Sequence, residues 1–205
     1  MMKNIGVIIL AAGFASRMGK QKLLLPLGEK PILMHVISTA MSTGFADCIT
    51  VIGEPKDKLA KLCTQLHSDW AYNSERHTGQ ASSIVLGLNK LQLDLDGILF
   101  LLGDQPLITQ ALLQALFDSF ASIGSNKSII VPRHKGQLYS PVLFGSWWRP
   151  HLAALSGDCG GRSFIRENPR YVIPVEWPDG NPFYDADSWE DYQSLCKLWV
   201  DRAVD

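Results

Sequence analysis

Short runs of apolar, often β-branched residues alternate along the chain with segments whose apolar residues recur every three or four positions. The first pattern predicts buried strands, and the second predicts helices with one buried face. Strands are expected at residues 5–10, 48–52, 97–102 and 128–131. Helices are expected at residues 31–42, 56–67, 80–91, from an N-cap at Thr109 onward, and at 188–200, where the buried face would hold Trp189, Tyr192, Cys196 and Trp199.

Strands that alternate with helices form βαβ units, so the sequence predicts an α/β fold with a Rossmann-like, mainly parallel sheet flanked by helices. The 205 residues suit a single domain spanning residues 1–205. Residues 132–182 are less regular and richer in Trp, Pro and Gly, and we interpret them as an insertion or lid that completes a site from one side. Ligands of such sheets bind beyond the carboxyl ends of the strands, where Gly13 and Asp104 fall.

Composition narrows the classes of partner. Net charge is −1, which provides no bulk attraction to nucleic acid or to an anionic membrane, so neither is expected as a partner. No apolar run has transmembrane length and no targeting signal is recognised, which favours a cytoplasmic location. The four cysteines are scattered without a CxxC pair, so reduced and mostly buried thiols are expected.

The segment 10–27 carries the strongest candidate for an anion site. It follows the first strand and begins with Ala11, Ala12 and Gly13, whose small side chains let a ligand approach the backbone N–H groups. Arg17 supplies a planar, permanently charged fork and Lys22 a point charge, and both suit a triphosphate. The spacing fits neither a P-loop nor a dinucleotide fingerprint, so a Gly-rich turn with solvated cations is the alternative.

Carboxylates follow at two places. Asp104 stands directly after an apolar strand, between Gly103 and Pro106, where it suits a Mg²⁺ ligand or an ordinary turn former. Asp185 and Asp187 precede the last helix, and Asp187 is equally suited to cap it.

Two Gly-containing turns also open helices. One of them holds Gly79 and Gln80, and the other runs from residue 157 to Arg162. A helix N-terminus presents unpaired N–H groups to an anion or an oxygen, although each turn is also explained by helix capping alone.

The sequence LAAGFASRMGKQKLLLPL at residues 10–27 resembles the LAAGxSxRMGxxKLL segment of the nucleotidyltransferase superfamily. Further likenesses follow in order: residues 73–83 to NPxxxxGQxxS, 103–106 to GDxP, 136–144 to GxxxGHPVLF, 156–162 to GDxGAR and 185–192 to DIDTPEDY. Departures are Ser74 for Pro, Tyr139-Ser140 for Gly-His and Ser188-Trp189 for Thr-Pro. Within that superfamily the chain looks most like the molybdenum cofactor cytidylyltransferases, which are MobA-like NTP transferases.

This resemblance implies a glycosyltransferase-A-like (nucleotide-diphospho-sugar transferase) fold and assigns roles. Arg17, Lys22 and Asp104 would be catalytic, and Mg²⁺ would be held by Asp104 with Asp185 or Asp187. The nucleotide would be bound by Leu10, Ala11, Ala12, Gly13, Asn73, Gly79, Gln80 and Ser83. The acceptor would be bound by Pro141, Gly157, Asp158 and Arg162.

The reaction implied is transfer of CMP from CTP to the phosphate of molybdenum-bound molybdopterin, with release of pyrophosphate. Ala12 stands where guanylyltransferase relatives usually have Gly, which favours CTP. A molybdoenzyme apo-protein of the xanthine dehydrogenase type, or its chaperone, would receive the product. The alternatives are a guanylyltransferase, a sugar-phosphate nucleotidyltransferase, and a non-catalytic nucleotide-binding chaperone.

Overall fold

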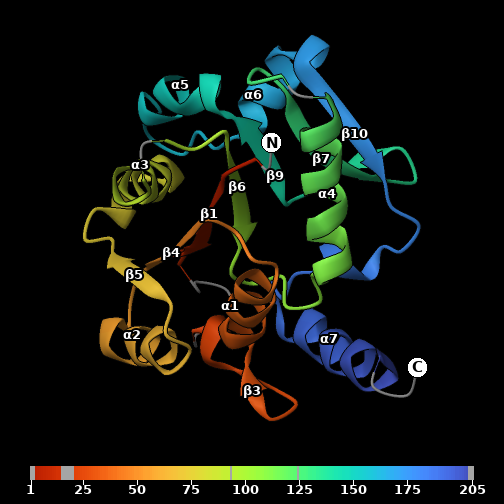
Figure 1. Ribbon diagram of the computed structural model, residues 1–205. Helices are drawn as coiled ribbons and strands as arrows, with labels where there is room; N and C mark the ends of the chain where they lie inside the picture. The colour runs from red at the N-terminus through yellow and green to blue at the C-terminus, as the bar shows by residue number, and fades with distance from the viewer. Residues whose placement is uncertain (1–2, 15–20, 93, 124, 203–205) are drawn as a thin grey trace.

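The computed structural model describes residues 3–14, 21–92, 94–123 and 125–202. Its centre is an eight-stranded sheet (Figure 1), whose strands are β1 (Ile5–Ala11), β4 (Asp47–Ile52), β5 (Asp69–Tyr72), β6 (Gly97–Leu102), β7 (Ile129–His134), β8 (Gln137–Leu138), β9 (Val142–Gly145) and β10 (Val172–Glu176). Their order is β10–β7–β9–β6–β1–β4–β5, with β8 beside β7. Strand β9 runs antiparallel to β6 and β7, and β1 runs parallel to β4 and β6.

Seven helices accompany the sheet in the described part of the chain: α1 (Ile32–Ser42), α2 (Lys56–Gln65), α3 (Gln80–Lys90), α4 (Gln110–Ile123), α5 (Arg149–Ala153), α6 (Arg162–Glu167) and α7 (Trp189–Arg202). A small hairpin of β2 (Pro26–Leu27) and β3 (Lys30–Pro31) follows the loop after β1. The predicted mainly parallel sheet flanked by helices is confirmed.

The sheet is buried on both faces because successive side chains of β1 enter two different apolar clusters. Val7 and Ile9 pack with side chains of α1, α2, α4 and α7, while Ile8 packs with side chains of α3 and α5. The neighbouring strand β6 is divided in the same way, with Leu99 and Leu101 on the first side and Phe100 on the second. Alternate side chains along β1 and β6 therefore face two different layers, one formed by α1, α2, α4 and α7 and the other built on α3 and α5 (Figure 1).

Residues 132–182 differ from the expected irregular insertion. They contribute β9, which is fully buried in the middle of the sheet, and β10 at one edge. The four residues of β9 follow Pro141, and a run of that length is too short for its pattern to be recognised in a sequence. The same region supplies residues that line the cavity described below.

The starts of α4 and α7 are capped by hydroxyl groups. Thr109 Oγ1 accepts a hydrogen bond from Leu112 N at 3.1 Å, which confirms the predicted cap of α4. At α7 the cap is Ser188, whose Oγ accepts from Asp191 N at 3.1 Å, while the Asp191 carboxylate accepts from Ser188 N at 2.9 Å. Asp187 is therefore not needed as the cap of this helix.

Helix α7 packs against α1 and the β2–β3 hairpin (Figure 1). Tyr192 donates a hydrogen bond to the Pro26 carbonyl at 2.5 Å, and a Cβ added to Gly28 would lie 2.7 Å from the Trp199 indole nitrogen. Trp189 differs from the expected buried position because it is 40% exposed, and Leu195 occupies the buried face instead. Of the cysteines, Cys63 is buried and Cys159 is exposed, so the expectation of mostly buried thiols holds only in part.

Candidate functional site

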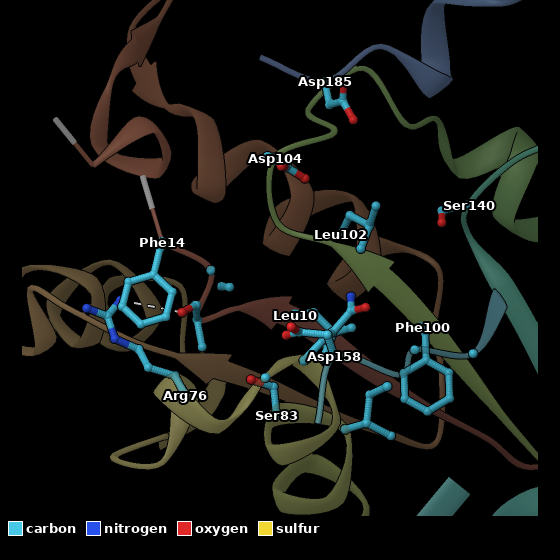
Figure 2. Close-up of a pocket in the computed structure, with 18 of the residues that line it drawn as sticks. Leu10, Phe14, Arg76, Ser83, Phe100, Leu102, Asp104, Ser140, Asp158 and Asp185 are labelled. Carbon is cyan, nitrogen blue, oxygen red and sulfur yellow. Dashed lines mark hydrogen bonds between the residues drawn. The ribbon is translucent and has the colours of Figure 1, made fainter. Parts of the chain in front are cut away.

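A cavity of about 790 Å³ opens at the edge of the sheet where β1 and β6 end (Figure 2). Its walls come from the loop after β1, the start of α3, the turn after β6, strand β9 and the segments 158–162 and 185–187. Gly13 and Asp104 both line it, as expected for a ligand site beyond the carboxyl ends of parallel strands.

One side of the cavity is lined by the loop after β1, through Leu10, Ala11, Ala12 and Gly13. Gly13 is exposed, and a Cβ added there would meet no atom of the described residues within 4 Å. The Arg76 guanidinium lies 4.3 Å from the centre of the Phe14 ring and donates a hydrogen bond to the Ala12 carbonyl at 3.4 Å (Figure 2). The loop thus presents small side chains and backbone to the cavity, while the predicted Arg17 lies outside the described residues.

Lys22 joins two of the predicted carboxylates. Its Nζ lies 2.5 Å from Asp104 Oδ2 and 2.6 Å from Asp187 Oδ1. Burial by itself lowers the pKa of Lys22, but the carboxylates of Asp104 and Asp187 outweigh it, so this pKa lies above its ordinary value and the ammonium stays charged. The structure therefore brings together three predicted site residues from positions up to 165 residues apart.

Asp185 is the third carboxylate of this region and also lines the cavity. Its pKa is raised by burial and by the nearby carboxylates of Asp104 and Asp187. Among the described residues, no three histidine, cysteine or carboxylate side chains lie close enough together to hold a metal ion, and the Lys22 ammonium lies between Asp104 and Asp187. The donor set still fits Mg²⁺, which needs hard oxygen ligands and takes only one or two carboxylates besides substrate phosphates.

The start of α3 forms the opposite side of the cavity. Gly79, Gln80 and Ser83 line it, as predicted. Asn73 does not: it is 3% exposed, and its amide donates to the Ser82 and Ser83 hydroxyls at 2.9 Å each. Its amide nitrogen joins the exit of β5 to the first turn of α3, and its Oδ1 accepts a hydrogen bond from Glu75 N at 2.9 Å, so the side chain has a structural role.

The segment 157–162 lies directly on that helix start. The Gly157 carbonyl accepts a hydrogen bond from Ala81 N at 3.1 Å. A Cβ added to Gly79, whose φ is +114°, would lie 2.2 Å from the Gly157 carbonyl. Asp158 and Arg162 line the cavity, whereas the predicted acceptor residues Gly157 and Pro141 are not among the residues that line it.

An apolar floor lies between these polar walls and was not predicted as part of the site. It consists of Ile84, Phe100, Leu102, Val142, Phe144 and Leu152. Phe100 and Phe144 meet edge to face with ring centres 5.9 Å apart. The floor comes from α3, α5 and the sheet face that packs against them, so its residues look like ordinary core in the sequence, and only the alternation within β6 gives a partial signal.

The cavity is therefore polarised. Lys22 and three carboxylates form one end, and an apolar floor rimmed by an amide, a hydroxyl and the Asp158 carboxylate forms the other. A charged group with its cations suits the first end, and a flat, largely apolar ring with polar edges suits the second. In the described residues no helix is long and apolar enough to cross a membrane.

Comparison with known proteins gives consistent results. The curated protein PucB of Bacillus subtilis, a purine catabolism protein, is 28% identical over 92% of this chain and 94% of its own length. The bifunctional protein GlmU of Acinetobacter baumannii is 40% identical, but the match covers 55% of this chain and only 25% of GlmU. The solved structure of Rv0371c from Mycobacterium tuberculosis superposes with a TM-score of 0.81 at 25% identity, covering 96% of this chain and 99% of that one.

The MobA-like NTP transferase domain matches residues 7–172, which hold the loop after β1, the carboxylate after β6 and the segment 157–162. Together with the mainly parallel sheet, this match confirms the expected glycosyltransferase-A-like fold and a nucleotidyltransferase activity. The chain belongs to the family of MobA-like NTP transferase domains.

Proposed function

We propose that this nucleotidyltransferase transfers CMP from CTP to the phosphate of molybdenum-bound molybdopterin and releases pyrophosphate. The observation that carries the proposal is the placement of Lys22 with Asp104 and Asp187 at one end of the cavity, beside the small-residue loop Ala11–Gly13. That end suits the triphosphate and its cations, while the apolar end suits a ring.

In the proposed reaction an oxygen of the acceptor phosphate attacks the α-phosphorus of CTP. A new phosphorus–oxygen bond forms, the bond to the β-phosphate oxygen breaks, and the electron pair leaves with pyrophosphate. Such transfers require positioning and neutralisation of charge rather than a protein nucleophile. The Lys22 ammonium supplies a fixed positive charge for this purpose, and backbone N–H groups of Ala12 and Gly13 supply donors for phosphate oxygens.

Asp104 and Asp187, with Asp185 beside them, are the residues that would hold Mg²⁺. When bound, this ion would neutralise phosphate charge and favour the leaving of pyrophosphate. Burial and the carboxylates of Asp104 and Asp187 raise the pKa of Asp185, so a cation bound beside Asp185 would favour its ionised form.

The acceptor assignment rests on Arg162, whose guanidinium fork suits a phosphate, and on the relationship to a purine catabolism protein. Enzymes of the xanthine dehydrogenase type oxidise purines, so an apo-enzyme of that class, or its chaperone, is the proposed receiver of the product. The location proposed for this step is the cytoplasm.

The test is incubation of the protein and Mg²⁺ with each of CTP, GTP, UTP and ATP, together with molybdenum-loaded molybdopterin or a sugar 1-phosphate. Pyrophosphate release and the mass of the product are measured. The proposal expects a cytosine dinucleotide with the pterin acceptor. A guanine dinucleotide would identify the protein as a guanylyltransferase instead, and a nucleotide sugar would identify it as a sugar-phosphate nucleotidyltransferase. Tight nucleotide binding without pyrophosphate release from any pair of substrates would indicate a non-catalytic protein.

A further inference from the structure

Asp158 stands at the end of the cavity that lies away from Asp104 and Asp185, in the segment that also carries Arg162. Figure 2 shows Asp158 and Ser83 toward α3, with Asp104 and Asp185 on the other side of Leu102. Asp158 lines the cavity together with Gln80 and Ser83 of α3. Its surroundings therefore belong to the start of α3 and not to the cluster around Lys22.

The backbone fixes this placement. The Gly157 carbonyl accepts from Ala81 N at 3.1 Å, and a Cβ at Gly79 would lie 2.6 Å from Asp158 N. A Cβ at Gly160 would in turn lie 2.4 Å from Gln80 Oε1. Because the segment touches the first turn of α3 at both of its ends, Asp158 is held over the helix start that lines the nucleotide side of the cavity.

The charge of Asp158 limits what can bind beside it. Among the described residues no salt bridge is formed by its side chain, which is exposed to the cavity. An ionised carboxylate only accepts hydrogen bonds, and it repels a phosphate. The group that binds next to Asp158 should therefore donate a hydrogen bond and carry no negative charge, and the apolar floor at Ile84 and Phe100 suits a flat ring.

We infer that Asp158 determines nucleobase specificity: its carboxylate accepts a hydrogen bond from the exocyclic amino group of cytosine and disfavours uracil, which carries a carbonyl at that position. This inference rests on the proposed function, because it assumes that CTP occupies the cavity with its phosphates at Lys22. The family resemblance implied that Asp158 binds the acceptor, whereas this inference assigns it to the nucleobase of CTP. Purines are not excluded by this contact and must be excluded by size.

The experiment measures the dissociation constants of CTP and UTP by calorimetry, with Mg²⁺ and without acceptor, for the wild type and Asp158→Asn. One well-placed contact to a base edge discriminates by about 10–100-fold. We expect the wild type to bind CTP more tightly than UTP by that factor. In Asp158→Asn the ratio of CTP to UTP affinity should fall about tenfold, because the Asn amide can donate a hydrogen bond to the uracil carbonyl. Asp158→Ala should weaken CTP binding and strengthen UTP binding, because it removes both the hydrogen bond to the cytosine amino group and the repulsion of the uracil carbonyl.

Asp118→Asn is the matched control. Asp118 lies on the exposed face of α4, where it accepts a hydrogen bond from Gln114 at 2.8 Å, and it does not line the cavity. The ratio of CTP to UTP affinity should be unchanged in this variant. Thermal melting of all variants verifies that each is folded.

An unchanged CTP-to-UTP ratio in folded Asp158→Asn would overturn the inference, and a raised KM for the pterin acceptor in the same variant would return Asp158 to the acceptor side. Those outcomes leave the proposed function standing. If the wild type binds neither nucleotide, the proposed function itself fails, and the inference fails with it.

Discussion

Replacing Lys22 by Met separates two effects that the structure places on one ammonium group. Met retains the apolar stem of Lys22 but removes the charge that contacts Asp104 and Asp187. We expect the variant to use the nucleoside triphosphate less well, because its phosphates lose a cation. We also expect it to bind a free divalent ion better in the absence of nucleotide, because the ammonium no longer competes for the two carboxylates.

The size of each effect follows from the contacts. A hydrogen bond to a charged group contributes about 1.5–3 kcal/mol when it is shielded. The Asp104 side chain is 20% exposed and that of Asp187 is 51% exposed, so solvent weakens the second contact most. If the Lys22 ammonium stabilises the two carboxylates by about 2 kcal/mol, its removal should tighten binding of the free divalent ion roughly 30-fold. Loss of one preorganised electrostatic group lowers kcat/KM by about 10²-fold or more.

The first assay is titration with Mn²⁺ in the absence of nucleotide, followed by electron paramagnetic resonance, and the second is steady-state pyrophosphate release. Lys61→Met, on the exposed face of α2, is the matched control and should change neither quantity. Unchanged or weaker Mn²⁺ binding would refute the competition between Lys22 and the ion. A kcat/KM within twofold of the wild type would refute the role of Lys22 in charge neutralisation.

Three other variants test neighbouring residues. Asp104→Asn keeps the shape of the side chain but removes a carboxylate, so kcat should fall by at least about 10²-fold at low Mg²⁺; near-normal turnover would defeat the assignment. Ala12→Gly removes a methyl group from the cavity wall and should raise the GTP-to-CTP ratio of kcat/KM about tenfold, and a ratio that stays constant would argue against steric selection. Burial, Asp104 and Asp187 raise the pKa of Asp185 above 3.8, so the folded state binds this proton more tightly and loses stability as pH rises through that pKa. Asp185→Asn should therefore raise Tm by about 1–3 °C at pH 7 and have no effect on Tm below pH 3.8, and a lower Tm at pH 7 would contradict the reasoning.

Long apolar runs allowed much of the fold to be predicted. Residues 5–10 and 97–102 are continuous apolar segments that read as buried central strands, and both are confirmed as β1 and β6. Strand β5 was missed because it has four residues at the edge of the sheet, two of them exposed. Strand β9 was missed because it is as short and follows Pro141, and its antiparallel direction depends on a pairing across 45 residues that no local pattern encodes.

The site was predictable where function is carried by loop residues and unpredictable where it depends on contacts between distant residues. Lys22, Asp104 and Asp187 were each recognised, but nothing in the sequence indicates that one ammonium joins both carboxylates. For Asn73 the sequence could not distinguish ligand binding from a structural role, because an amide in a loop can donate either to a ligand or, as here, to Ser82 and Ser83. The apolar floor gave only a partial signal, through the alternation within β6, since the residues of a cavity wall and of a core are alike in sequence.

The packing of α7 on the β2–β3 hairpin has a consequence for biosynthesis. The cation at residue 22 is made before its partner Asp187, which follows 165 residues later, and Tyr192, which donates to the Pro26 carbonyl, follows 166 residues after Pro26. At about 5–20 residues per second, these parts are separated by roughly 10–35 s on the ribosome. A nascent chain can therefore pair the Lys22 ammonium with Asp104 before Asp187 exists, and the second carboxylate joins this end of the cavity only when residue 187 has been made.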